Sequence, residues 1–374
     1  MYFAKHSKAY GDLYVPSFSV ALGSSSSDIL TAHGLAATSV SVDLALSMSG
    51  TFSFSIPHTF DPERSEFLTK NKDSALDLLT LGTRVWISMG YGDKSGLDPI
   101  LSGYITAVGT SFAEGGSPTL EVSGVDSTYL LTLGTEDRQY EEITVKDMVT
   151  KIAGENNLTA EIEGLPGNKM LLGSNLETDL AYLNALAKKF SNTDQKFEFY
   201  ARPTSSGDTL HFGPRAVKSA PIGTLTWGVD LLSFKPEIAI GNQVSKVKVH
   251  GWDQLKKKAI VGVATRAPAD SGGTGGGSLI KALFGKEAVL HLRQPVKTLK
   301  EANDRAAAEL AERATDYVSG TGETFGLPEL LPDTTIALDG LGKRFSKTFY
   351  VSKTVHRFDS SGYRTRFTVE RTAM

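Results

Sequence analysis

The sequence predicts a mainly β fold with α+β insertions, and three observations lead to this fold class. Apolar residues alternate with serine, threonine or charged residues in the N-terminal third and again near the C-terminus, as in strands buried on one face. Helical spacing of apolar residues is confined to two stretches in the middle and one near the C-terminus. The 37 glycines among 374 residues gather with serine, aspartate and proline between these segments, which is typical of a protein with many turns.

The first strands are expected in the N-terminal third. In residues 39–57 (SVSVDLALSMSGTFSFSIP) the alternation continues on both sides of a Met48-Ser49-Gly50 turn, which predicts a hairpin. Three more strands are expected at residues 84–89, 100–108 and 119–124, separated by turn clusters. The pattern leaves open whether residues 61–81 form a helix or a loop.

The middle of the chain changes to helical periodicity. Thr144 precedes apolar residues at i, i+3, i+4, i+7 and i+8, which predicts a capped amphipathic helix. A second helix is expected from Thr178 to Phe190, followed by a hairpin of residues 196–200 and 209–213. A further strand is expected at residues 244–251.

Two features stand out in the C-terminal third. Residues 267–285 are rich in glycine and serine, which predicts an exposed, mobile loop because such a segment loses much chain entropy on ordering. Thr298 and Glu301 form a capping-box pattern that opens an alanine-rich helix over residues 299–317. Glu301/Arg305 and Glu309/Arg313 are pairs at the i,i+4 spacing of that helix.

A hairpin is predicted to close the chain, with residues 359–362 (DSSG) as its loop. The core face is expected to carry Phe349, Val351 and Val355 on one strand and Tyr363, Thr365, Phe367 and Val369 on the other. Arg364 and Arg366, with Lys353 and Arg357, form a basic face. A solvated face is favoured there over contact with a polyanion.

The composition excludes several classes of protein. The chain has no cysteine, which excludes disulfides, thiolate metal sites and a cysteine nucleophile. Residues 1–11 have no signal-peptide pattern, and no segment approaches the roughly eighteen apolar residues of a membrane span. We therefore expect synthesis in the cytoplasm without membrane insertion. With 39 basic and 42 acidic residues, stable nucleic-acid binding is not expected.

Nucleotide-binding motifs are incomplete. Gly342-Lys343 resembles the end of a phosphate-binding loop, but Ala337 replaces the first glycine and Arg344 the hydroxyl residue. Gly285-Lys286 has Ile280 at the first glycine position, and the run of residues 272–277 lacks the Gly-x-Gly-x-x-Gly spacing. The glycine pair is therefore interpreted as a turn before two strands.

No catalytic residue, cofactor or metal site is predicted, and we expect the protein not to be an enzyme. The histidines, at positions 6, 33, 58, 211, 250, 291 and 356, form no metal-binding motif. His250 and His356 are interpreted as half-buried polar positions on strands. A carboxylate pair for glycoside hydrolysis stays open, with Asp126, Asp253 and Asp333 as candidates, although turn capping explains these residues equally well.

The order and spacing of several segments resemble the phage late control protein D family, the baseplate hubs of contractile tails. The similar segments are TDLAYLNALAKKF, KFEFYARPTSSGDTLHFGP, VSKVKVHGWDQLKKKAI and GLPELLPDTTIALDGLGKRFSKTFYVSKTVHRF. The resemblance extends from about Pro16 to Val369. The family is related to the N-terminal hub part of type VI secretion spike proteins.

The resemblance implies two tail-tube-like β-barrel domains around a helix-containing middle region. We expect a first barrel at residues 1–135, completed by later strands, an α+β middle domain at 136–240, and a second barrel at 241–374 that includes the glycine-rich loop and the helix. It also implies a homotrimer, a pseudo-sixfold ring that adapts a hexameric inner tube to a trimeric spike. Tyr350, His356 and Phe358 are candidates for its interface, with core packing as the alternative.

The implied partners follow from that role. They are the inner tube or a tube-initiator protein, the baseplate wedge proteins and a separate trimeric spike, because the chain stops at Met374, after the last hub strand. The chain would be made in the bacterial cytoplasm and assembled into a phage tail or injection particle. Two alternatives stay open: a particle-associated cell-wall glycosidase, and a β-rich carbohydrate-binding or receptor-binding module.

Overall fold

The N-terminal region forms strands where the period of two predicts them. The computed structural model describes residues 15–24, 27–192, 195–204, 207–253, 256–265 and 273–374. The elements of this region are β1 (Pro16–Leu22), α2 (Ile29–His33), β2 (Ser39–Ala45), β3 (Thr51–Pro57), β4 (Phe60–Asp61), β5 (Glu66–Phe67), α3 (Ala75–Leu78), β6 (Arg84–Tyr91), η1 (Lys94–Gly96), β7 (Pro99–Ser111), β8 (Thr119–Asp126) and η2 (Ser127–Thr132). The hairpin is confirmed as β2 and β3, and the three further strands as β6, β7 and β8. Residues 61–81 contain both the short helix α3 and part of a small β4–β5 hairpin.

The middle region contains the two predicted helices and the predicted hairpin. Its elements are β9 (Glu136–Ile143), α4 (Val145–Glu155), β10 (Leu158–Ile162), β11 (Met170–Glu177), α5 (Asp179–Phe190), β12 (Phe197–Thr204) and β13 (Gly207–Pro214). The Thr144 side chain accepts a hydrogen bond from the Asp147 N–H, and Thr178 caps α5 in the same way. β10 extends the β12–β13 hairpin by parallel pairing, while β9 and β11 form a separate two-stranded sheet.

The C-terminal region is built mostly from strands, with one long helix. Its elements are β14 (Thr224–Thr226), β15 (Leu231–Ile238), β16 (Lys246–Asp253), β17 (Lys258–Ala264), α6 (Gly276–Phe284), β18 (Val289–Arg293), α7 (Leu299–Thr315), β19 (Val318–Phe325), β20 (Thr334–Asp339), α8 (Gly342–Phe345), β21 (Thr348–Asp359) and β22 (Gly362–Arg371). The predicted capped helix is confirmed as α7, because Thr298 Oγ1 accepts from the Glu301 N–H at 3.1 Å. Both predicted i,i+4 ion pairs are present along it.

The prediction of a loop over residues 267–285 is wrong for its second half. Residues 276–284 form α6, whose C-terminus is closed by Gly285 with φ of 62°. Leu279 packs against the core of the C-terminal region, so an apolar contact offsets the entropy cost of ordering the glycines. Residues 267–272, the first part of the predicted loop, lie outside the described residues.

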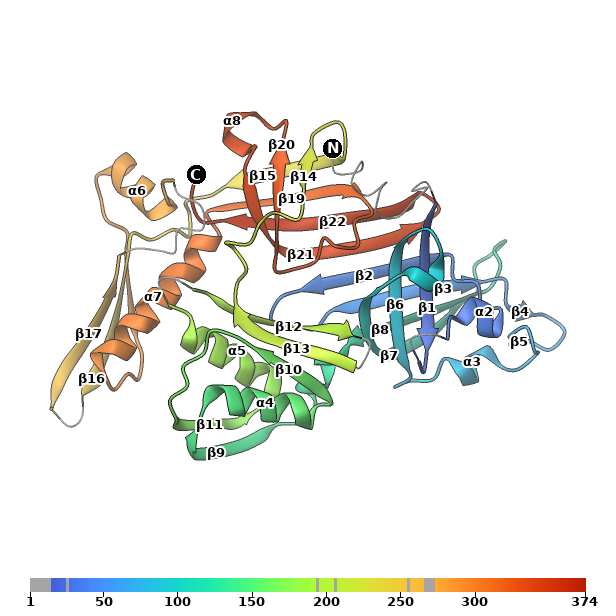
Figure 1. The fold of residues 1–374 in the computed structure, drawn as a ribbon, viewed down its shortest axis with the longest axis horizontal. Coiled ribbons are helices and arrows are strands. Elements are labelled where there is room, and N and C mark those ends of the chain that lie inside the picture. Colours follow the sequence, from blue (N-terminus) through green and yellow to red (C-terminus); the bar gives the residue numbers. More distant parts are fainter. Residues whose placement is uncertain (1–14, 25–26, 193–194, 205–206, 254–255, 266–272) are drawn as a thin grey trace.

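One twelve-stranded sheet joins the two ends of the chain (Figure 1). Its order is β1-β6-β7-β8-β3-β2-β21-β22-β19-β15, and β20 pairs with β21 and β14. The pairing of β2 with β21 makes the sheet continuous between the N-terminal and C-terminal regions. β14 and β15 lie within the predicted middle domain of residues 136–240, and they pair with C-terminal strands of this sheet.

The strand around residue 250 does not join that sheet. β16 lies instead in a three-stranded sheet of order β17-β16-β18, covered on one face by α7. β16 lies within the predicted second barrel of residues 241–374, and it pairs outside the twelve-stranded sheet. Figure 1 shows this sheet projecting from the body of the molecule beyond α7.

The closing hairpin is confirmed as β21 and β22, with one correction. A register shift between Val351 and Lys353 exchanges the faces of β21. Beyond it, Thr354 and His356 are buried while Val355 is half-buried on the other face, so the assignment of Val355 to the core face is wrong. On β22 the predicted core residues are all buried.

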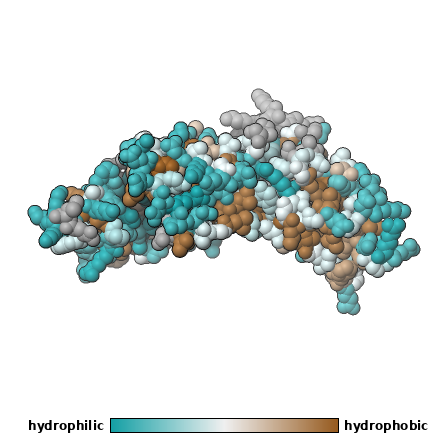
Figure 2. Space-filling model, turned by 90° about the horizontal axis from the view of Figure 1, so that it is seen from below, coloured by the Kyte–Doolittle hydropathy of each residue, from teal (hydrophilic) through white to brown (hydrophobic). Residues whose placement is uncertain are grey.

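Four apolar clusters stabilise the molecule. One lies under the N-terminal strands, one joins α4 and α5 to β12 and β13, one lies under β19 to β22, and one lies between α7 and the three-stranded sheet. Figure 2 shows that the molecule as a whole is arched, with one concave side.

Candidate assembly surfaces

The three carboxylates considered for catalysis make structural hydrogen bonds. Asp253 accepts from the Lys256 N–H at the end of β16. Asp333 accepts from the hydroxyls of Tyr350 and Tyr200, at 2.9 and 3.1 Å, and from the Ala216 N–H. Asp126 accepts from the backbone N–H groups of Gly50 and Thr128. Each therefore closes a turn or joins two segments.

Asp126 and Asp208 are two buried carboxylates beside the same small cavity. Both line a cavity of only about 10 Å³, which has room for about one water molecule and none for a sugar. Burial raises the pKa of Asp126 to about 6, although hydrogen bonds from Thr128 and Gly50 oppose the shift. Asp208 is buried against Arg84, at 2.9 Å. Asp208, on β13, therefore holds the middle region against the N-terminal strands, while Asp126 bonds within the N-terminal region.

The structure brings two of the histidines together. His250 Nε2 lies 2.9 Å from His291 Nδ1, and the two rings stack. Sequence spacing could not reveal this pair because β16 and β18 are parallel neighbours connected by a long segment. Among the described residues no three histidine, aspartate or glutamate side chains are grouped as metal ligands. His6 lies outside the described residues.

The Gly342-Lys343 pair begins a single helical turn, α8, between β20 and β21. Gly342 has φ of 74°, so the glycine serves the turn that leads into α8. The prediction placed a strand directly after the pair, and α8 corrects that detail.

Three of the four basic side chains on this face of the closing hairpin form ion pairs with nearby carboxylates. Lys353 pairs with Asp43 at 2.8 Å, and Arg366 pairs with Glu323 at 3.0 Å. Arg357 pairs with Asp359, and the Arg364 guanidinium lies over the Phe325 ring. This arrangement is that of a solvated, polar sheet face.

Two of the residues considered for an interface are part of the core. Tyr350 and His356 are 4% and 0% exposed, and Phe358 is half-buried against Phe18. Tyr350 bonds to Asp333, and His356 bonds to Tyr363 and Leu330. Tyr350 and His356 therefore belong to the core of one chain, which is the alternative to an interface role.

A buried arginine joins the middle region to the large sheet. Arg215 contacts Glu198 on β12 at 2.7 Å and Glu370 on β22 at 2.8 Å. Burial alone would raise the pKa of Glu198, but the Arg215 guanidinium holds that pKa below its usual range. The two regions are thus fixed to each other by a satisfied charge cluster.

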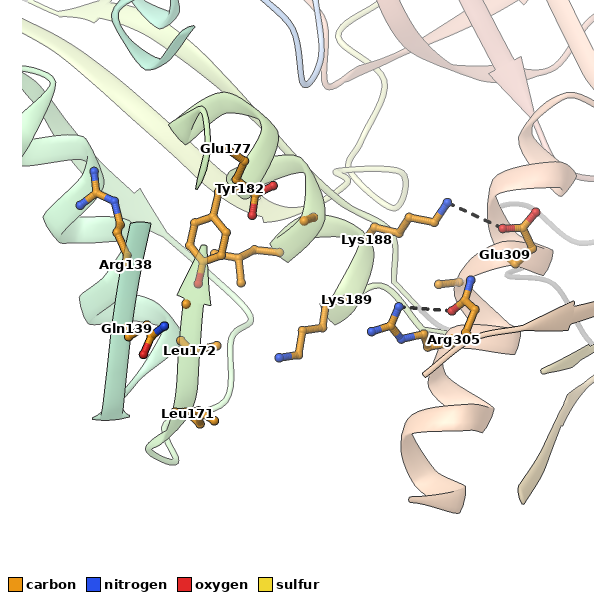
Figure 3. Close-up of a pocket in the computed structure, with 15 residues that line it drawn as sticks. Arg138, Gln139, Leu171, Leu172, Glu177, Tyr182, Lys188, Lys189, Arg305 and Glu309 are labelled. Atoms are coloured by element: carbon orange, nitrogen blue, oxygen red, sulfur yellow. Dashed lines mark hydrogen bonds and ion pairs between the residues drawn. The ribbon is translucent and has the colours of Figure 1, made fainter. Parts of the chain in front are cut away.

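A groove of about 660 Å³ separates the middle region from α7 (Figure 3). Leu171 and Leu172 of β11 form one wall, and Arg305 of α7 lies on the other. Lys188 reaches across it to Glu309 at 3.7 Å. The polar groups are spread along the rim and converge on no single point, so the groove fits docking or domain packing better than catalysis.

In the described part of the chain, the first and last strands in the order of the large sheet, β1 and β15, each pair with a neighbour on one side only. β1 pairs with β6 and β15 pairs with β19, and no second strand pairs with either among the residues that the structure describes. Single bridges at Ala21 and Leu231 touch them locally. Such edges are templates for pairing with another chain. β15 contains Pro236, which removes one donor from its edge.

No helix in the described part of the chain is long and apolar enough to span a membrane. Residues 60–360 match the family model described as the Alg8 N-terminal domain. No curated protein matches the sequence.

Solved structures resemble this chain over almost its whole length. The 43 kDa tail protein of prophage MuSo2 from Shewanella oneidensis is 16% identical, with a TM-score of 0.68 over 95% of this chain and 98% of that one. The tail protein from Neisseria meningitidis MC58 is 14% identical, with a TM-score of 0.66 over 96% and 97%. The E. coli c3393 protein is described as a component of the type VI secretion system with structural similarity to T4 bacteriophage tail proteins gp27 and gp5. It is 12% identical, with a TM-score of 0.58 over 94% and 76%. At these identities the likeness shows the fold, and the predicted mainly β class with α+β insertions is confirmed.

Proposed function

The chain belongs to the family of the Alg8 N-terminal domain and has the fold of phage tail proteins, and from this premise we propose that it is a structural baseplate hub. Three copies form a ring at the centre of a contractile tail or contractile injection system. The ring joins the inner tube to the spike, and the chain makes and breaks no bond in a substrate. The resemblance to the late control protein D family supports the same role.

The observation that carries the proposal is that the large sheet ends in strands that pair on one side only among the described residues, namely β1, β15 and, on the β20 branch, β14. Within the described part of one copy, no strand pairs with the outer side of β1 or β15, and the molecule is arched (Figure 2). Repetition of an arched unit by a rotation that closes gives a ring, in which each unpaired edge is covered by the next copy. Closure therefore stabilises the assembly without a ligand.

The strand count supports a ring with pseudo-sixfold symmetry. The twelve strands divide at the β2–β21 pair into six N-terminal strands (β1, β6, β7, β8, β3, β2) and six C-terminal strands (β21, β22, β19, β15, β20, β14). Each copy supplies two similar units, so three copies supply six. Such a ring matches a hexameric tube on one side and a trimeric spike on the other.

The strand order of the large sheet also suggests where the domains divide. We propose that the two tube-like barrels use the six N-terminal and the six C-terminal strands. The middle domain and the three-stranded sheet with α7 then lie outside the barrels.

The proposed partners are the inner tube or tube-initiator protein, the baseplate wedge proteins and a separate trimeric spike. The proposed location is a phage tail or injection particle assembled in the bacterial cytoplasm. No observation favours the carbohydrate-binding or receptor-binding alternative, and the cavity beside Asp126 and Asp208 is too small for a glycosidase site.

Electron microscopy of the purified chain tests the proposal. We expect threefold rings with a central channel that bind purified tube and spike proteins. A chain that stays monomeric at 100 μM or more and binds neither protein would overturn the proposal. Clearing of a peptidoglycan suspension would favour the glycosidase alternative.

A further inference from the structure

The three-stranded sheet of β16, β17 and β18, called the arm below, has one face, called the bare face, that no element of the described residues covers. α7 covers the other face, where Val247 and Val249 are fully buried. The bare face exposes Trp252 by 55%, Val261 by 40% and Val263 by 42%. These side chains form one patch. Trp252 of β16 lies opposite Ala259 of β17, and Val261 and Val263 follow Ala259 at every second position, on the same face of the sheet.

Basic groups surround this patch. Lys248 lies opposite Val263, and Arg293 of β18 lies opposite His250 in the parallel register. Residues 244–253, 256–264 and 286–293 contain seven lysines and arginines against two acidic residues, Asp253 and Glu287. An exposed tryptophan with aliphatic neighbours and a cationic rim is the composition of a protein interface, whereas singly exposed apolar residues need no explanation.

The patch fits an acidic protein surface better than a nucleic acid. Faces that bind single-stranded nucleic acid stack successive bases on several aromatic rings. Here two valines lie beside one tryptophan, and the two other aromatic rings of this face, His250 and His291, stack on each other. A partner surface should therefore carry carboxylates together with exposed apolar side chains.

The chain itself carries such a surface on the β9–β11 sheet, called the ribbon below. Asp137, Glu141 and Glu142 are exposed on it, as are Leu176 by 69% and Leu171 by 67%, the latter at the wall of the groove beside α7. The cation of β9, Arg138, is turned inward and bonds to Asp179 at 2.9 Å, so the outer charge of the ribbon is negative. α7 separates the arm sheet from the body of its own chain (Figure 1), so the bare face is turned away from its own ribbon.

We propose that the bare face of the arm docks on the ribbon of a second copy of this chain. The contact is heterologous, which is the type that closes a ring of identical subunits. The inference rests on the proposed ring and adds a second contact to the sheet edges. Because its rim is charged, the contact should weaken as salt rises.

A charge swap in the full-length chain tests the inference. Lys248→Glu/Arg293→Glu reverses the arm, and Glu141→Lys/Glu142→Lys reverses the ribbon. We expect each double variant to weaken self-association by about tenfold in sedimentation velocity at low salt, because like charges then face each other. A chain that carries all four substitutions should recover to within about threefold of wild type, since opposite charges face each other again. Lys218→Glu/Lys347→Glu reverses two exposed lysines elsewhere and serves as the control.

The outcomes separate the two proposals. If wild type forms rings and neither reversal changes their stability, the ring stands and the arm–ribbon contact is overturned. A four-substitution chain no better than the double variants also overturns it. If wild type never associates, the arm–ribbon contact is overturned, and the hub proposal fails as well when the chain also binds neither the tube nor the spike protein. If the arm reversal instead abolishes binding of a labelled single-stranded oligonucleotide by wild type, the bare face is a nucleic-acid site and the inference is wrong.

Discussion

His356 illustrates how one residue holds the closing hairpin to the loop that precedes it. The imidazole is fully buried, with Nδ1 2.8 Å from the Tyr363 hydroxyl and Nε2 3.1 Å from the Leu330 carbonyl oxygen. Burial lowers the pKa of His356 to about 4, although the Leu330 carbonyl oxygen opposes the shift. The prediction that His356 is half-buried is therefore wrong, because a half-buried imidazole would not have its pKa lowered so far. The ring is neutral in the folded chain at neutral pH.

This burial predicts a specific pH dependence of stability. The unfolded chain protonates the imidazole below about pH 6.5, while the folded chain resists protonation down to about pH 4. The unfolded state therefore binds more protons in this window, and the free energy of unfolding falls as the pH falls through it, by about 3 kcal/mol in full. Urea unfolding of wild type and His356→Gln at pH 7 and pH 4.5 measures it. The glutamine variant should lose about 2 kcal/mol less than wild type over this range, and equal losses would contradict the assignment.

At the scale of elements, the packing of α7 on the arm depends on a glycine in β17. A Cβ built at Gly262 would lie 2.2 Å from the carbonyl carbon of Ala302, a backbone atom that cannot rotate away. Gly262→Ala should therefore push α7 off the arm and destabilise it by about 1–3 kcal/mol. With Trp86 and Trp227 replaced by phenylalanine in every chain compared, Trp252 fluorescence in a urea titration reports on the arm. Gly241→Ala is the matched control, because nothing lies within 4 Å of its Cβ and its φ is not positive. Equal midpoints for both variants would contradict this packing.

Elements held by short-range signals could be predicted from the sequence, and those held by distant contacts could not. Thr144 and Thr298 cap their helices as their spacing to Asp147 and Glu301 indicates, because a cap involves only one turn of chain. α6 was missed because its stability comes from Leu279 packing on a distant core. The face of Val355 was missed because the shift in β21 depends on pairing with β22. For the same reason, the bare face of the arm appeared only once β16, β17 and β18 were placed side by side.

At the scale of the whole molecule, ring closure couples the stability of each chain to its concentration. If three folded copies associate and unfolded chains do not, mass action stabilises the folded state as concentration rises. For a trimer that unfolds to three chains, a tenfold dilution removes about 0.9 kcal/mol per chain, two thirds of the usual 1.4. The urea midpoint should therefore fall steadily between 100 and 1 μM, approaching a constant value once the ring has dissociated. Lys248→Glu/Arg293→Glu should reach that constant value at a higher concentration, because it lacks one of the two contacts between copies. A wild-type midpoint that is independent of concentration over the whole range would mean that the open ends of the sheet are not covered by another copy, and the geometric role proposed for this chain would then lose its physical basis.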